Sequence, residues 1–162
     1  MLQTVEQIRD AAAAILRHVI RLYANGNSVD ASVALACECD PSVSSLYIHV
    51  AQSDDDPFGD PMTWSGAYVE QHGSTYEKPA WFAEFDKLNS DYFSSSNEDE
   101  SGYVEIEQYF QKILNGVSVA LHLIQPELAE WGFPDNIKLA VVTEDDDNEK
   151  TMYERVEAFN NL

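Results

Sequence analysis

The chain has very little positive charge. Nine lysines and arginines face 29 aspartates and glutamates among 162 residues, which gives a formal net charge of −20 at pH 7. Because phosphate groups are bound by Lys and Arg, this composition argues against nucleic acids and anionic membrane surfaces as partners. The excess keeps a protein soluble and speeds its encounter with cationic partners. A merely acidic, well-solvated surface explains the charge equally well.

The chain also has few cysteines and no long apolar run. Cys37 and Cys39 are the only cysteines, and a lone C-x-C without further ligands is a weak metal signal. We therefore expect two small buried residues in a reducing cytosol, and no metal or other cofactor. The first ten residues lack the basic start of a secretory signal. The apolar stretches fall far short of the ~20 residues of a membrane span, so we expect a cytoplasmic protein.

The remaining composition is that of a folded domain. Hydrophobic residues make up 44% and aromatic residues 11% of the chain, which is too much for a disordered acidic tail. The length is typical of one domain, and no linker divides it. We therefore expect a single domain over residues 1–162.

Apolar periodicity predicts four helices. Thr4 and Gln7 form a capping-box pattern before the first, and Gly26 suits a left-handed cap at its end. Further helices are expected over residues 79–93, 104–123 and 149–159. Gly116 inside the third of these helices indicates close packing against a neighbour. Residues 63–71 fit a short helix or a strand, and we favour the helix.

Three segments have the pattern of strands. Residues 31–38 and 44–50 predict an antiparallel hairpin. Residues 137–143 are almost continuously apolar, as expected of a buried strand. The order of elements predicts an α+β (or α/β) domain, with a small, mixed, mainly antiparallel sheet covered by an N-terminal, a long central and a C-terminal helix.

The acidic residues are concentrated in three runs, within residues 54–60, 98–100 and 144–149. Clustered Asp residues invite a calcium site, but neither longer run has the alternating ligands and central Gly of an EF-hand. The chain has no nucleophile elbow, zinc-protease motif or phosphate-binding glycine loop. The four histidines are expected to be structural or surface residues, so we predict that the protein is not an enzyme.

Aromatic residues lie close in sequence to the acidic runs. Aromatic anchors with a charged rim are typical of protein interfaces, and Trp64, beside the first run, is the best candidate for an exposed anchor. The predicted partner-binding residues are Asp54, Asp55, Asp56, Asp60, Trp64, Tyr68, Glu144, Asp145, Asp146 and Asp147.

Several short motifs resemble one bacterial family. The quoted residues are Trp64, Ser65, Tyr68 and His72; Phe85, Asp86, Leu88 and Asn89; the apolar strand ending in acids at 139–147; and Phe159, Asn160 and Asn161. Together with the order of elements, they resemble the family called domain of unknown function 4303. That family includes candidate immunity proteins of polymorphic toxin systems, and it supplies no catalytic residues to compare.

The resemblance implies an immunity protein that neutralises a toxin by docking on or beside its active site. Nuclease toxins are commonly basic because they bind phosphate groups, so an acidic inhibitor would be steered to one. Three alternatives remain: a DNA mimic that inhibits a DNA-binding protein, a metal-dependent hydrolase using clustered Asp residues, and an acidic cytoplasmic domain with a scaffold role.

Overall fold

A computed structural model describes residues 2–39, 46–68, 79–94, 100–143, 146 and 149–158; of residues 67, 68 and 149 it describes only the backbone. The order of elements is α1 (Val5–Gly26), β1 (Ala34–Glu38), β2 (Tyr47–Ala51), η1 (Pro61–Thr63), β3 (Gly66–Tyr68), α2 (Ala80–Ser94), α3 (Glu100–Ile124), η2 (Gln125–Trp131), β4 (Lys138–Val142) and α4 (Glu149–Glu157). The predicted α+β class is confirmed, as are the helices and the hairpin.

The four strands form one mixed sheet in the order β3-β2-β1-β4. β2 is antiparallel to both β1 and β3, whereas β4 is parallel to β1. The prediction of a helix over residues 63–71 is wrong, because residues 66–68 form β3. Gly66 explains part of this outcome: a Cβ there would lie 2.7 Å from the carbonyl oxygen of Val50, so only glycine lets β3 approach β2 this closely.

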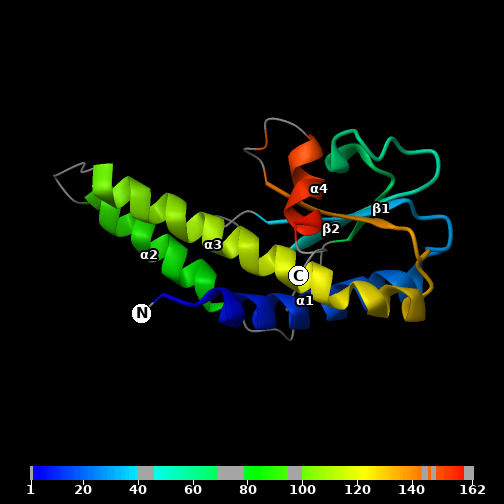
Figure 1. Ribbon diagram of the computed structural model, residues 1–162, viewed down its shortest axis with the longest axis horizontal. Helices are drawn as coiled ribbons and strands as arrows, with labels where there is room; N and C mark the ends of the chain where they lie inside the picture. Colours follow the sequence, from blue (N-terminus) through cyan, green and yellow to red (C-terminus); the bar gives the residue numbers. More distant parts are fainter. Residues whose placement is uncertain are drawn as a thin grey trace.

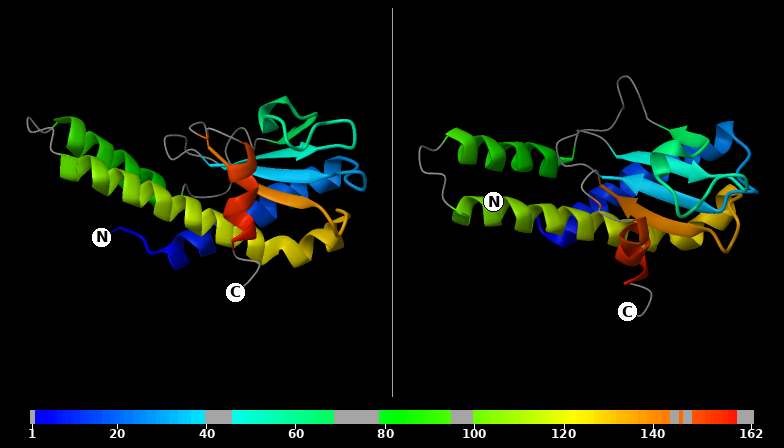
Figure 2. Two further views of the ribbon diagram at one scale, coloured as in Figure 1. Left: turned by 45° about the horizontal axis from the view of Figure 1, so that its top comes forward. Right: turned by 90° about the horizontal axis from the view of Figure 1, so that it is seen from above.

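The two faces of the sheet differ in side-chain size. The face toward α1 and α3 (Figure 2) carries larger residues such as Leu35, Ile48 and Leu139. The other face carries small residues such as Ala36 and Ala140, and it is covered by side chains of α4 and of the segment after β2. Cys37 and Cys39 are buried and free of disulfides, as predicted.

α1 and α3 run side by side beneath the sheet (Figure 1). The capping box of α1 is present, with Thr4 Oγ1 accepting from the Gln7 backbone N–H and Gln7 Oε1 accepting from the Thr4 backbone N–H. The predicted left-handed cap at Gly26 is wrong. Asn27 ends the helix in an extended conformation, and its side-chain amide donates to the Tyr23 carbonyl at 3.0 Å.

α2 and the first half of α3 form a helical hairpin that extends beyond the sheet (Figure 1); we call it the arm. Phe85 packs on Phe110 near its base, with ring centroids 6.3 Å apart. At the far end Tyr92 lies against Gly102. No helix in the described part of the chain is long and apolar enough to cross a membrane.

Candidate partner-binding surface

The first acidic run lies in a well-organised loop, residues 52–65, between β2 and β3; we call it the acidic loop. The Asp55 carboxylate joins the two ends of this loop. It accepts hydrogen bonds from the backbone N–H of Gln52 at 2.8 Å, and from the backbone N–H and the hydroxyl of Ser65 at 3.0 and 2.7 Å. These hydrogen bonds, that of the Ser65 hydroxyl foremost, lower the pKa of Asp55, because they favour the ionised form.

Trp64 is buried, so the prediction of an exposed aromatic anchor at this position is wrong. Its side chain is 6% exposed and packs on the alanine-rich face of the sheet. The indole Nε1 donates a 2.8 Å hydrogen bond to the carbonyl oxygen of Asp56. A large ring fits here because it packs in a cluster to which the strands contribute Ala34, Ala36, Ala51 and Ala140. Trp64 therefore holds the acidic loop against the sheet and does not project from it.

Three carboxylates of the acidic loop remain on the surface. Asp54, Asp56 and Asp60 are all exposed. Asp56 Oδ1 accepts from the backbone N–H of Phe58 at 3.0 Å, and Asp60 Oδ1 accepts from that of Met62 at 3.0 Å, which caps η1. Such Asx turns fix the backbone while the carboxylate stays in water. The loop thus presents negative charge from a defined conformation.

Two exposed apolar side chains in this loop escaped the sequence analysis. Phe58 is 58% exposed and Met62 is 45% exposed. Each lies two residues after an Asp, and the carboxylate of that Asp accepts a hydrogen bond from its backbone N–H. This Asp-x-apolar spacing is the sequence pattern that could have indicated the two exposed positions. Phe58 is supported from below by Lys138, whose Nζ lies 4.2 Å from the ring centroid, and by the edge of Tyr153. Phe58 and Met62 are thus exposed where Trp64 was expected to be exposed.

Tyr153 connects the acidic loop to α4. Its hydroxyl donates to the carbonyl oxygen of Pro57, and its ring is buried. Burial, with a smaller contribution from the charge of Asp56, raises the pKa of Tyr153 to about 12, since both oppose ionisation of the phenol. The loop therefore rests on α4 as well as on the sheet.

The end of β4, after which the second predicted acidic segment begins in the sequence, lies at the other end of the sheet from the acidic loop. β1 and β2 pair Ala34 with Ala51, and β1 and β4 pair Glu38 with Val142. The acidic loop follows Ala51, whereas β4 ends at Val142, so the loop and the end of β4 lie at opposite ends of the sheet. In the described part of the second segment, Asp146 pairs with Arg155 of α4.

Asp146 is the one residue of that segment that the structure describes, and its carboxylate is engaged. It forms a two-pronged ion pair with Arg155 and accepts from the backbone N–H of Thr143 at 3.1 Å. Its side chain is only 10% exposed. Asp146 thus stabilises the connection between β4 and α4. Glu144, Asp145, Asp147, His72 and the side chain of Tyr68 lie outside the described residues.

His49 and Glu38 form a second buried polar pair, on the small-residue face of the sheet. His49 Nε2 lies 2.9 Å from a carboxylate oxygen of Glu38. Both side chains are largely buried. In the described part of the chain, no group of three or more His, Cys, Asp or Glu side chains is placed to hold a metal ion.

Another exposed apolar surface lies at the far end of the arm. Phe93 is 78% exposed, and Tyr103 and Val104 are also exposed. Tyr92 and Phe93 stack edge to face, with centroids 5.3 Å apart. Asp86, Asp91 and Glu105 are exposed on the same two helices. The arm is therefore a second candidate for a partner-binding surface, beside the acidic loop.

No family model, curated protein or solved structure matches this chain.

Proposed function

We propose that the protein is a non-enzymatic, cytoplasmic binding protein that neutralises a basic partner protein by covering it with the acidic loop. The observation that carries the proposal is that exposed apolar side chains and exposed carboxylates lie together in that loop. Phe58 and Met62 project among Asp54, Asp56 and Asp60, and residues 52–65 contain no Lys or Arg. Phe58 also contacts the ammonium group of Lys138, but the charged residues of the loop itself are all acidic. Apolar side chains on such a charged loop are typical of a protein-binding surface.

The rigidity of the loop supports the same proposal. Asp55 joins its two ends, and Trp64 fixes it to the sheet. A loop already held in one conformation loses little entropy on binding, so more of the contact energy remains as affinity. The long-range field of a chain with net charge −20 would accelerate its encounter with a basic surface.

The kind of partner follows from the resemblance to the domain of unknown function 4303 family. That resemblance remains a prediction. It implies an immunity protein whose target is a bacterial toxin. A nuclease toxin matches the acidic loop best, because nucleases carry basic surfaces to bind phosphate. Occupation of such a surface by the acidic loop would block the toxin sterically and electrostatically.

The test compares two charge-matched triple variants. The loop variant carries Asp54→Asn, Asp56→Asn and Asp60→Asn; asparagine keeps an acceptor oxygen for the Asx turns, and Asp55 is left intact. The control carries Asp86→Asn, Asp91→Asn and Glu105→Gln on the arm. Both variants change the net charge by the same amount.

Association rates with the captured basic partner are measured by stopped flow from low to high salt. We expect the loop variant to associate roughly tenfold more slowly at low salt, with the difference vanishing near ~0.5 M salt, where charges are screened. The control should associate at close to the wild-type rate. If the arm variant is the slower one, the interface lies on the arm and the proposal is wrong.

A further inference from the structure

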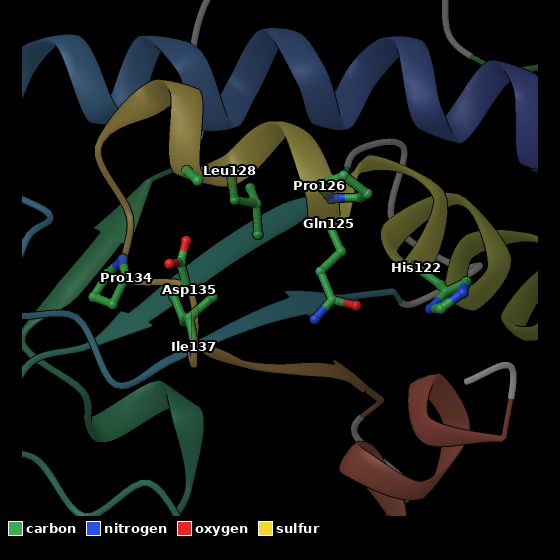
Figure 3. A pocket seen from close by; sticks show the side chains of 8 residues that line it. His122, Gln125, Pro126, Leu128, Pro134, Asp135 and Ile137 are labelled. Carbon is green, nitrogen blue, oxygen red and sulfur yellow. The ribbon is translucent and has the colours of Figure 1, made fainter. Parts of the chain in front are cut away.

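A pocket of about 200 Å³ opens between the end of α3, η2 and the segment before β4 (Figure 3). Its apolar lining includes Leu128, Pro134 and Ile137. Pockets for drug-sized ligands are usually about 300–1,000 Å³. This pocket is smaller, and its size suits a single inserted side chain.

Local sequence fixes the walls of this pocket. η2 begins with Gln125-Pro126 and ends at Gly132, whose φ of 98° is open to glycine but costly for other residues. The Gly132 N–H donates to the carbonyls of Ala129 and Leu128. The Ile137 N–H donates to the carbonyl of Pro134 at 3.3 Å, which tightens the turn into β4. The walls therefore exist before any ligand arrives.

The polar groups of the pocket favour a cation. Asp135 contributes a carboxylate from one wall and Gln125 an amide from the other (Figure 3), and no Lys or Arg is among the described residues that line the pocket. The imidazole of His122 also lines it, and its Nδ1 is buried without a hydrogen-bond partner. The C-terminal end of a helix such as α3 carries partial negative charge. An anion would meet the Asp135 carboxylate and be repelled.

The pocket and the acidic loop meet at the start of β4. Ile137 lines the pocket, and the next residue, Lys138, places its ammonium group under the ring of Phe58. The two sites therefore flank the same end of one edge strand. The pocket residues Leu128 and Ile137 belong to the core on one face of the sheet, and Trp64 and Tyr153, which hold the acidic loop, belong to the cluster on the other. A partner that covers both sites must therefore span the edge strand β4.

From this geometry we infer that the pocket receives an arginine side chain of the basic partner. The aliphatic part would pack on Leu128, Pro134 and Ile137, while the guanidinium would donate to the Asp135 carboxylate, a pairing that the planar fork of arginine suits. The inference rests on the proposed function for the identity of the partner. The recognition of a guanidinium by the pocket can be tested without that partner.

The test uses N-acetyl-L-arginine amide as the probe and N-acetyl-L-citrulline amide, which has nearly the same shape and no charge, as its control. Each is titrated into ¹⁵N-labelled protein at 150 mM salt and followed by NMR. We expect saturable shifts at His122, Gln125 and Ile137 with the arginine probe only. Shifts of equal size with citrulline, or shifts spread evenly over the acidic surface, would overturn the inference.

Two variants sharpen the experiment. Asp135→Asn should weaken arginine binding roughly tenfold, since it removes a charged hydrogen-bond partner. Glu130→Gln removes an exposed carboxylate of η2 that does not line the pocket, and it should change the affinity less than about twofold. Equal losses in both variants would show general charge attraction and contradict the inference. Because no partner protein is present, this result is independent of the kinetic test of the acidic loop.

Discussion

The indole Nε1 of Trp64 donates a 2.8 Å hydrogen bond to the carbonyl oxygen of Asp56. This bond joins the buried base of the acidic loop to the part that faces the solvent. Trp64, which was expected to be exposed at an interface, is therefore buried inside the protein. The exposed side chains of the loop include Phe58, Met62 and three aspartates, and these are the residues that we propose to contact a partner.

Trp64→Phe should loosen the acidic loop without unfolding the domain. The change keeps most of the ring's contacts and removes one of the two donors to the Asp56 carbonyl, which still accepts from the Gly59 N–H at 3.0 Å. The expected loss of unfolding free energy is about 1 kcal/mol. Hydrogen exchange should accelerate at residues 53–65 and stay unchanged in α1 and α3. Uniform acceleration over the whole chain would mean that Trp64 has no local role.

Asp55 should contribute to acid stability. Its pKa is lowered in the folded protein, so the carboxylate stabilises the fold above its unfolded pKa of about 3.9, and this contribution is lost as the pH falls through the lower folded pKa. Asp55→Asn should reduce stability at pH 7 and flatten the dependence of unfolding free energy on pH below about 4. Asp54→Asn removes the same charge from the exposed neighbour and is the control. Equal changes in both variants would assign the effect to net charge and contradict a specific contribution of Asp55.

Gly116→Ala should destabilise the protein, although alanine normally favours a helix over glycine by about 0.5–1 kcal/mol. A Cβ at Gly116 would lie 2.7 Å from the Cβ of Ile8 on α1, so the two helices would have to move apart at a cost of about 1–3 kcal/mol. Asn115→Ala, on the exposed side of the same turn, is the control and should be neutral or slightly stabilising. Urea unfolding of both variants gives the comparison.

Arg155→Met should cost about 3 kcal/mol of unfolding free energy. The change removes both bonds to Asp146 and a 2.7 Å bond to the Val141 carbonyl, and it leaves a largely buried carboxylate without its cation. Lys150→Gln disturbs the exposed pair of Lys150 with Glu154 and should cost less than about 0.5 kcal/mol. Losses of similar size in thermal denaturation would contradict a structural role for the Asp146–Arg155 pair.

The sequence predicted the helices well because their signals are local. The apolar stripe and capping box of α1 need no information from the rest of the chain. The position of Gly116 also indicated a close contact, since a glycine inside a helix costs stability and is expected where a neighbouring element packs closely. Its neighbour, Ile8, lies in a distant segment that the pattern alone could not identify.

The errors have long-range causes. Residues 63–71 were expected to be helical, but residues 66–68 form a strand that pairs with the edge of β2. Trp64 was expected to be exposed, but the facing strands supply alanines that leave room for its ring. Both outcomes depend on what lies opposite in space. The negative charge was evident in the sequence. Only the structure shows that Asp55 and Asp146 accept hydrogen bonds within the protein, whereas Asp54 faces solvent.

The most direct measurement of the central claim is affinity capture from the cell's own lysate at low salt, with elution by a salt gradient. Wild type and the Asp54→Asn/Asp56→Asn/Asp60→Asn variant are immobilised side by side. We expect one basic protein that elutes stoichiometrically from the wild type at high salt and is lost, or elutes at much lower salt, from the variant. Diffuse release of many basic proteins from both columns at modest salt would contradict it.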